Sequence, residues 1–184
     1  DGTYEELRYM LLTTLNRTNQ VSTNNQPWIA EMTEARKQLI MKYFTLLTPA
    51  ISEEEKAMGI SVMPSYEQVK DFFNLLIDYL SRGHFDIYPK ILNIMEHVSS
   101  RRLTIARRLV PRIQDNTDEI LKIADEYNSE LDEGIMKHLK EDLAHLGQLL
   151  EIRFTHEDRM VIALQILENK QTEDAPDCAL ATRA

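Results

Sequence analysis

The fold of this chain is decided between residues 78 and 88, where it reads Asp78-Tyr79-Leu80-Ser81-Arg82-Gly83-His84-Phe85-Asp86-Ile87-Tyr88. Upstream of this stretch, apolar residues recur at helical spacing, and Ser65 with Gln68 forms the capping-box pattern that starts a helix. We expect Gly83 to end that helix in a left-handed conformation and Pro89 to lie in the first turn of the next helix. The two helices should therefore meet at a sharp corner, which gathers four dissimilar side chains: Asp78, Ser81, His84 and Phe85.

Helical periodicity continues over most of the remaining chain, which has only five glycines, six prolines and few alternating β-branched runs. The sequence therefore predicts an all-α protein whose helices, joined by short turns, pack as an antiparallel up-and-down bundle. Residues 1–168 should form a single helical bundle domain, which begins with a short helix and loop over 1–26, and residues 169–184 should form a disordered tail. The expected helices cover residues 3–15, 27–46, 65–82, 87–98, 103–131, with a kink or restart at Pro111, and 135–167.

The last expected helix carries charged residues in its apolar register. A leucine stripe from Leu139 to Leu150 continues at the same spacing to Arg153 and Glu157. A buried charge must be paired, because an isolated ion in a protein core is very costly. Arg153 and Glu157 should therefore either form a structural polar layer with each other and a neighbour, or mark a place where the bundle opens onto a surface.

The charge of the chain bears on its partners. A formal net charge of −9 argues against direct nucleic-acid binding, because Lys and Arg contacts to phosphates supply most of that affinity. Ten acidic residues against three lysines lie between Asp115 and Asp142, which favours a basic protein partner. The opposite cluster, five arginines between Arg101 and Arg112, is interpreted as a solvated helix face.

Cysteine content and hydropathy bear on the compartment. The single cysteine, Cys178, permits no internal disulfide and no metal site built from cysteines. No apolar run approaches the roughly 20 residues needed to span a bilayer, and no secretory leader is visible. We expect a cytoplasmic protein that does not bind membranes.

Two separated motifs, in the same order, resemble the Rsd/AlgQ family of bacterial regulators of the primary sigma factor. The resemblance spans about residues 36–167 and rests on the 78–88 stretch together with residues 150–158, which read Leu-Glu-Ile-Arg-Phe-Thr-His-Glu-Asp. Further matches are Arg36-Lys37, Tyr43, Pro111 and Asn116-Thr117.

One position departs from the family pattern. The family has a Trp four residues before the Arg, whereas this chain has Met32 there and Trp28 one turn earlier. Residues four apart lie on the same face of a helix, so the fold should be retained. The resemblance implies a four-helix bundle with additional short helices.

Family resemblance also implies a function, that of an anti-sigma factor. The partner would be the C-terminal domain of the primary sigma factor, which reads the −35 promoter element through a helix-turn-helix. Binding would block its contacts with promoter DNA and core RNA polymerase and favour alternative sigma factors. Asp78 lies off the apolar stripe and Phe85 adds an aromatic anchor beside the acid, a typical composition of a protein interface. The expected partner-binding residues are Asp78, Ser81, His84 and Phe85, although His84 could instead cap a helix end.

Three other functions are weighed against this one. A helical adaptor that regulates an enzyme or a signalling carrier through the same pocket is the alternative, and a second protein partner stays open. A di-metal enzyme would need two Glu-x-x-His pairs, whereas Asp142 and His145 form one approximate match. Catalysis by Ser81 and His84 lacks an evident oxyanion hole. We therefore expect no enzyme activity, no metal and no cofactor.

Overall fold

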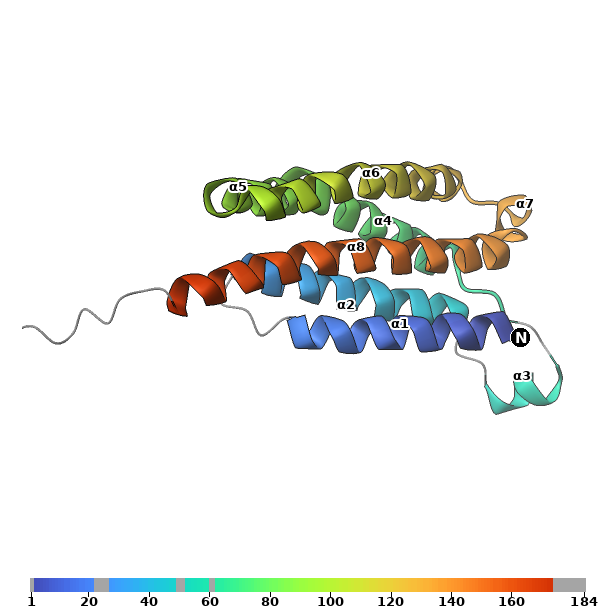
Figure 1. Cartoon of the computed structure of the whole chain (residues 1–184). Coiled ribbons are helices and arrows are strands. Elements are labelled where there is room, and N and C mark those ends of the chain that lie inside the picture. The colour runs from blue at the N-terminus through green and yellow to red at the C-terminus, as the bar shows by residue number, and fades with distance from the viewer. Residues whose placement is uncertain (1, 22–26, 49–51, 60–61, 174–184) are drawn as a thin grey trace, which may run out of the picture.

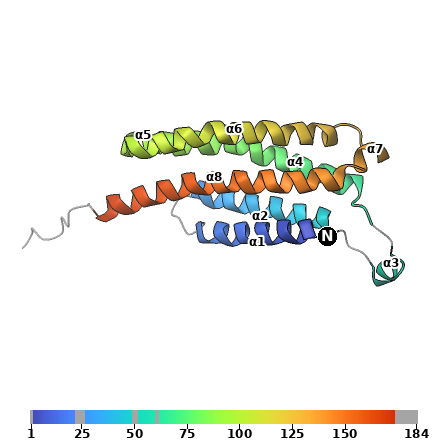
Figure 2. The same cartoon turned by 45° about the vertical axis from the view of Figure 1, so that its right-hand side comes forward.

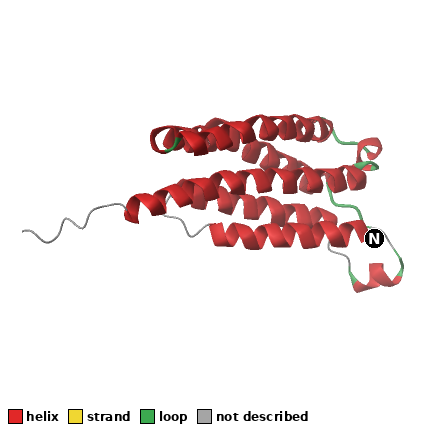
Figure 3. Cartoon of the chain, in the orientation of Figure 1, coloured by secondary structure: helices red, strands yellow, loops and turns green. Residues whose placement is uncertain are grey.

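The computed structural model describes residues 2–21, 27–48, 52–59 and 62–173 of the 184-residue chain. These residues contain helices and no strand, so the all-α prediction is confirmed (Figure 3). No helix in these ranges is long and apolar enough to cross a membrane. The elements are α1 (Gly2–Val21), α2 (Pro27–Leu47), α3 (Glu53–Ala57), α4 (Tyr66–Arg82), the π-helix η1 (Gly83–Ile87), α5 (Tyr88–Val98), α6 (Ser100–Asn128), α7 (Glu133–Met136) and α8 (Leu139–Glu173).

The long helices lie side by side and successive ones run in opposite directions (Figure 1). Helix α8 packs against α1, α2, α5 and α6, and α4 packs between α2 and α6. The short helix α3 stands apart from the bundle in both views (Figures 1 and 2). Together α2, α4, α6 and α8 surround the core, and α1 packs on α2 and α8.

Helix α1 is longer than predicted. It continues to Val21, whereas the sequence predicted a loop from residue 16 onward. Leu7, Leu11 and Thr14 are buried, and the polar residues that follow Leu15 suggested a loop because they interrupt the apolar period of the sequence. The remainder of that expected loop, residues 22–26, lies outside the described residues.

The predicted start of α4 is confirmed by its capping contacts. Ser65 Oγ accepts a hydrogen bond from the Gln68 backbone N–H at 3.2 Å, and Gln68 Oε1 accepts one from the Ser65 N–H at 2.9 Å. Ser99 caps the start of α6, which begins at Ser100 and not at residue 103 as predicted. Of the kink or restart expected at Pro111, the restart is wrong, because α6 passes through Pro111 without interruption. Pro111 is exposed, so the carbonyl that loses its N–H partner there faces solvent.

The expected corner at Gly83 is also wrong. Gly83 has helical angles, φ −57° and ψ −52°, and the chain continues through η1 into α5. A side-chain carbon at Gly83 would lie 2.8 Å from Tyr88 Oη and 3.3 Å from Arg153 Nη2. Glycine is therefore required here for close approach of another side chain, not for a left-handed conformation. Pro89 lies in the first turn of α5, as predicted.

The last helix begins later and ends later than predicted. Asp132 Oδ1 accepts a hydrogen bond from the Ile135 N–H at 2.8 Å and caps the short helix α7, so α8 begins only at Leu139. It ends at Glu173, which places residues 169–173 of the expected tail in the helix. Residues 174–184 lie outside the described residues.

The core consists of two apolar clusters that meet along a polar boundary. Helix α8 contributes Phe154 to the first cluster and Met160 to the second, and α2 contributes Leu39 and Met32 in the same way. Between them, on α8 and α2, lie the buried charged residues of the 153–158 region and Arg36. The bundle thus contains a layer of buried charge in the middle of its length.

Candidate functional site

Six residues form this polar layer, and all are buried: Arg36, Tyr79, Tyr88, Arg153, Glu157 and Asp158. Glu157 is at its centre. Its Oε2 accepts hydrogen bonds from Tyr79 Oη at 2.5 Å and from Arg36 Nη2 at 2.9 Å. Its Oε1 accepts from Tyr88 Oη at 2.6 Å and from Arg153 Nε at 3.1 Å. One carboxylate therefore joins α2, α4, α5 and α8.

Short contacts also join the other charged groups of the layer, although Asp158 Oδ2 is buried without a hydrogen-bond partner. Arg36 Nη1 donates to Asp158 Oδ1 at 2.5 Å, and Arg153 Nη1 donates to Thr117 Oγ1 at 2.7 Å. Each tyrosine hydroxyl donates to Glu157 and also accepts from an arginine. Two guanidinium groups face two carboxylates, so the layer is electrically balanced.

The contacts hold Glu157 in its ionised form. Burial alone would raise the pKa of Glu157, but Arg153 and Arg36, with hydrogen bonds from Tyr79 and Tyr88, lower it below its ordinary value. Burial, with Glu157 nearby, raises the pKa of Tyr79 and of Tyr88. Both phenols are therefore neutral and remain donors at ordinary pH.

The sequence pattern selected Arg153 and Glu157 for this layer and did not identify Arg36, Tyr79, Tyr88 and Asp158. The structure brings all six together. Arg36 follows Met32 by four residues and precedes Leu39 by three, so it also stands in apolar register. The register argument that selects Arg153 would have found Arg36 as well.

The four expected partner-binding residues lie on the outside of the same segment. Asp78, Ser81, His84 and Phe85, here called the outer site, are all exposed. Phe85 is 78 % exposed, and the His84 ring packs edge-on against it with centroids 4.9 Å apart. Asp78 and Ser81 lie three residues apart on α4, which places them on the same side of that helix, and Phe85 follows in η1.

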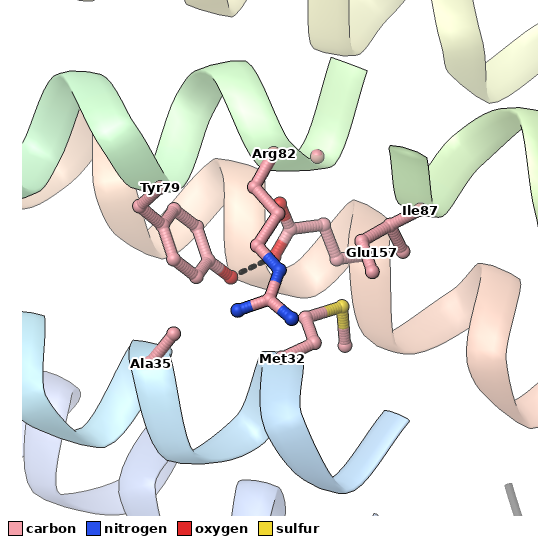
Figure 4. Close-up of a pocket in the computed structure, with 7 residues that line it drawn as sticks. Met32, Ala35, Tyr79, Arg82, Ile87 and Glu157 are labelled. Atoms are coloured by element: carbon pink, nitrogen blue, oxygen red, sulfur yellow. Dashed lines mark hydrogen bonds between the residues drawn. The ribbon is translucent and has the colours of Figure 1, made fainter. Parts of the chain in front are cut away.

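A small pocket lies beside the polar layer (Figure 4). The Arg82 side chain reaches from α4 toward α2, where it forms an exposed ion pair with Glu31. The Tyr79–Glu157 hydrogen bond lies at the polar end of the pocket (Figure 4). No residue of the outer site is among those that line it, which are Met32, Ala35, Tyr79, Arg82, Gly83, Ile87 and Glu157.

The described residues also hold no group of three or more His, Cys, Asp and Glu side chains arranged to bind a metal ion. The exposed outer site and the buried polar layer are thus the two chemically distinctive features of this part of the bundle.

Residues 10–165 match the family described as "Regulator of RNA polymerase sigma(70) subunit, Rsd/AlgQ". The chain belongs to the Rsd/AlgQ family. A Rsd/AlgQ relative named "Regulator of sigma D" from Yersinia enterocolitica (serotype O:8 / biotype 1B) is 30% identical over 145 residues, 78% of this chain and 83% of the relative. The protein of the same name from Pectobacterium carotovorum subsp. carotovorum (strain PC1) is 30% identical over 152 residues, 82% of this chain and 96% of the relative. No solved structure matches the chain.

Proposed function

We propose that this chain is an anti-sigma factor that binds the C-terminal, −35-recognising domain of the primary sigma factor through the outer site. Its membership of a family of regulators of the RNA polymerase sigma(70) subunit supports a sigma factor as the partner. The relatives named "Regulator of sigma D" support the same class of partner.

The observation that carries the proposal is the exposed ring of Phe85, which packs against the ring of exposed His84. Exposing a large aromatic ring to water has no benefit for stability, whereas such a ring at an interface supplies large apolar contact area. Asp78, seven residues earlier, is also exposed and adds a negative charge, and the chain as a whole carries −9. A domain that reads DNA through a helix-turn-helix presents basic side chains, which an acidic surface attracts while it repels DNA.

Occupation of that domain would prevent it from contacting promoter DNA and core RNA polymerase. Core polymerase would then be available to alternative sigma factors. The action is stoichiometric binding in the cytoplasm, not catalysis, and needs no cofactor.

The test is a titration of the purified sigma C-terminal domain with the full chain, followed by calorimetry or fluorescence anisotropy. Phe85→Ala is expected to weaken binding by at least about 2 kcal/mol, roughly thirtyfold, because the aromatic anchor is lost. Tyr9→Ala is the matched control, since Tyr9 is an equally exposed aromatic residue on α1. Association should also slow as ionic strength rises.

Two results would overturn the proposal. The first is the absence of binding between the wild-type chain and the sigma domain. The second concerns the site alone, and is equal affinity of the Phe85→Ala and Tyr9→Ala variants for the sigma domain.

A further inference from the structure

A single stripe of exposed residues runs along the outer side of α6. Its members are spaced by four and three residues in strict alternation, which keeps them on one face of a helix. All of them are exposed. The α6 stripe consists of Arg101, Ile105, Arg108, Arg112, Asp115, Glu119, Lys122 and Glu126.

The charge pattern of the α6 stripe is complementary to that of a second α6 stripe running in the opposite direction. The first half carries three arginines and the second half three acids. Two copies laid antiparallel, with the two-fold axis at the bond between Ile113 and Gln114, place Arg112 opposite Asp115 of the other copy. Each arginine then faces an acid and each acid an arginine; the remaining pairs are Arg108 with Glu119, Arg101 with Glu126 and Ile105 with Lys122.

Within a single chain the stripe contains neighbours of like charge as well as neighbours of opposite charge. Arg108 and Arg112 are like charges four residues apart, and so are Asp115 and Glu119, and such pairs destabilise a helix. Among the described residues, none of these four forms an ion pair. Arg107, next to the stripe, does form one, with its Nη2 3.8 Å from Glu96 Oε1. Opposite charges from a second copy would offset this repulsion.

We propose that the α6 stripe is a self-association surface, on which a second copy of this chain binds antiparallel about a two-fold axis. Helix α6 lies along one edge of the bundle in both views, so its outer side is open to a partner (Figures 1 and 2). A mean spacing of 3.5 residues keeps the two stripes in contact when helices cross at about 20°. An acidic segment of another protein would match only the arginine half, whereas a second copy matches both halves.

The complex is weak and transient. Exposed ion pairs contribute little individually, and only Ile105 and the aliphatic part of Lys122 add apolar contact to the stripe. A single pair of helices also buries less surface than a stable dimer interface. The affinity therefore depends on the number of matched pairs, and each substitution changes two pairs at once because the interface is symmetric.

Charge-reversal variants of the full chain test this surface, with self-association measured by analytical ultracentrifugation at low ionic strength. Arg108→Glu and Glu119→Arg should each weaken self-association about tenfold, because each turns two attractive pairs into repulsive ones. Mixing the two variants should restore it, since every Arg108→Glu chain then faces a Glu119→Arg chain with both pairs attractive. The mixture should therefore contain mixed dimers and few dimers of either variant alone.

The controls are Arg107→Glu and Asp118→Arg, which make the same changes in net charge at exposed positions of α6 outside the stripe. These variants should self-associate like the wild type, and mixing them should not change the strength of association. The proposal is overturned if the wild type stays monomeric at the highest concentration reached, or if the stripe variants and the controls behave alike. Failure of the Arg108→Glu and Glu119→Arg mixture to restore association would overturn the antiparallel pairing.

Discussion

The two sides of the segment from Asp78 to Tyr88 differ in the burial and contacts of their side chains. On the inner side, Tyr79 and Tyr88 contact Glu157 in a layer that is buried and whose charged groups form ion pairs. On the outer side, Asp78 and Phe85 are exposed. One stretch of eleven residues therefore supports stability with one side and presents a surface with the other, and substitutions should separate the two effects.

The largest effect is expected from Arg153→Ala. It removes a guanidinium that donates to Glu157, Thr117 and Tyr88, and leaves the Glu157 carboxylate short of one buried partner. The free energy of unfolding should fall by about 3 to 5 kcal/mol, measured by urea denaturation. Arg159→Ala is the control, because Arg159 is exposed on the same helix. A loss under about 1 kcal/mol for Arg153→Ala would mean that the layer behaves as an exposed pair.

Next in size is the effect of Asp78→Ala on binding. If Asp78 pairs with a basic residue of the sigma domain, its truncation should cost about 2 to 5 kcal/mol of binding free energy, a thirtyfold loss or more. Thermal stability should change by no more than about 0.5 kcal/mol, as is usual for exposed positions. Asp125→Ala, an exposed acid on α6, serves as control. Wild-type affinity in a stable Asp78→Ala protein would remove Asp78 from the site.

A smaller change in stability is expected from Gly83→Ala. In an ordinary helix this substitution stabilises by up to about 1 kcal/mol. Here the new methyl group would lie 2.8 Å from Tyr88 Oη and push the phenol away from Glu157. We expect a destabilisation of about 1 to 3 kcal/mol instead, with exposed Ser81→Ala nearly neutral. A stabilised Gly83→Ala protein would show that the close approach does not matter.

The most gradual effect is that of pH on stability. The pKa of Glu157 is lowered in the folded protein. The contribution of Glu157 to the free energy of unfolding is therefore complete above about pH 5 and is lost as pH falls through the folded-state pKa. The pKa values of Tyr79 and Tyr88 are raised, so their contribution is complete below about pH 10 and is lost as pH rises further.

Denaturation at a series of pH values measures this profile. The acid slope due to Glu157 should not exceed about 1.4 kcal/mol per pH unit, the limit for one proton. Tyr88→Phe should reduce the loss of stability on the alkaline side, because one of the two phenols is then absent. A profile that stays flat at both ends would mean that the layer does not titrate with unfolding.

Much of the fold follows from local patterns, which is why the helix after Ser65 begins where the sequence places it. Apolar register also identifies Arg153, Glu157 and, applied to α2, Arg36. Tyr79 and Tyr88 could not be assigned to the layer, because a tyrosine in apolar register fits an ordinary core equally well. The role of Gly83 was hidden for a related reason: a helix-ending glycine and a closely packed one look the same until the position of Tyr88 is known.

The outer site was selected from the sequence as one exposed acid and one aromatic anchor on a turn. Exposure of its four residues follows from their places between the apolar positions of α4 and η1. Their mutual arrangement does not, because the turn is a π-helix and not a corner. Only the His84–Phe85 ring contact joins two of them directly among the described contacts.

The π-helix has a consequence for how this chain tolerates insertions and deletions. Each residue of an α-helix turns the chain by about 100°, so the wider turn at Gly83–Ile87 sets the rotation of α5 relative to α4. A π-turn takes up one residue more than an α-turn, so deletion of one residue there, with return to an ordinary α-helix, would change the rotation of α5 much less than a deletion within α4 or α5 would. In this segment the chain therefore accommodates a change in the number of residues that its flanking helices would not.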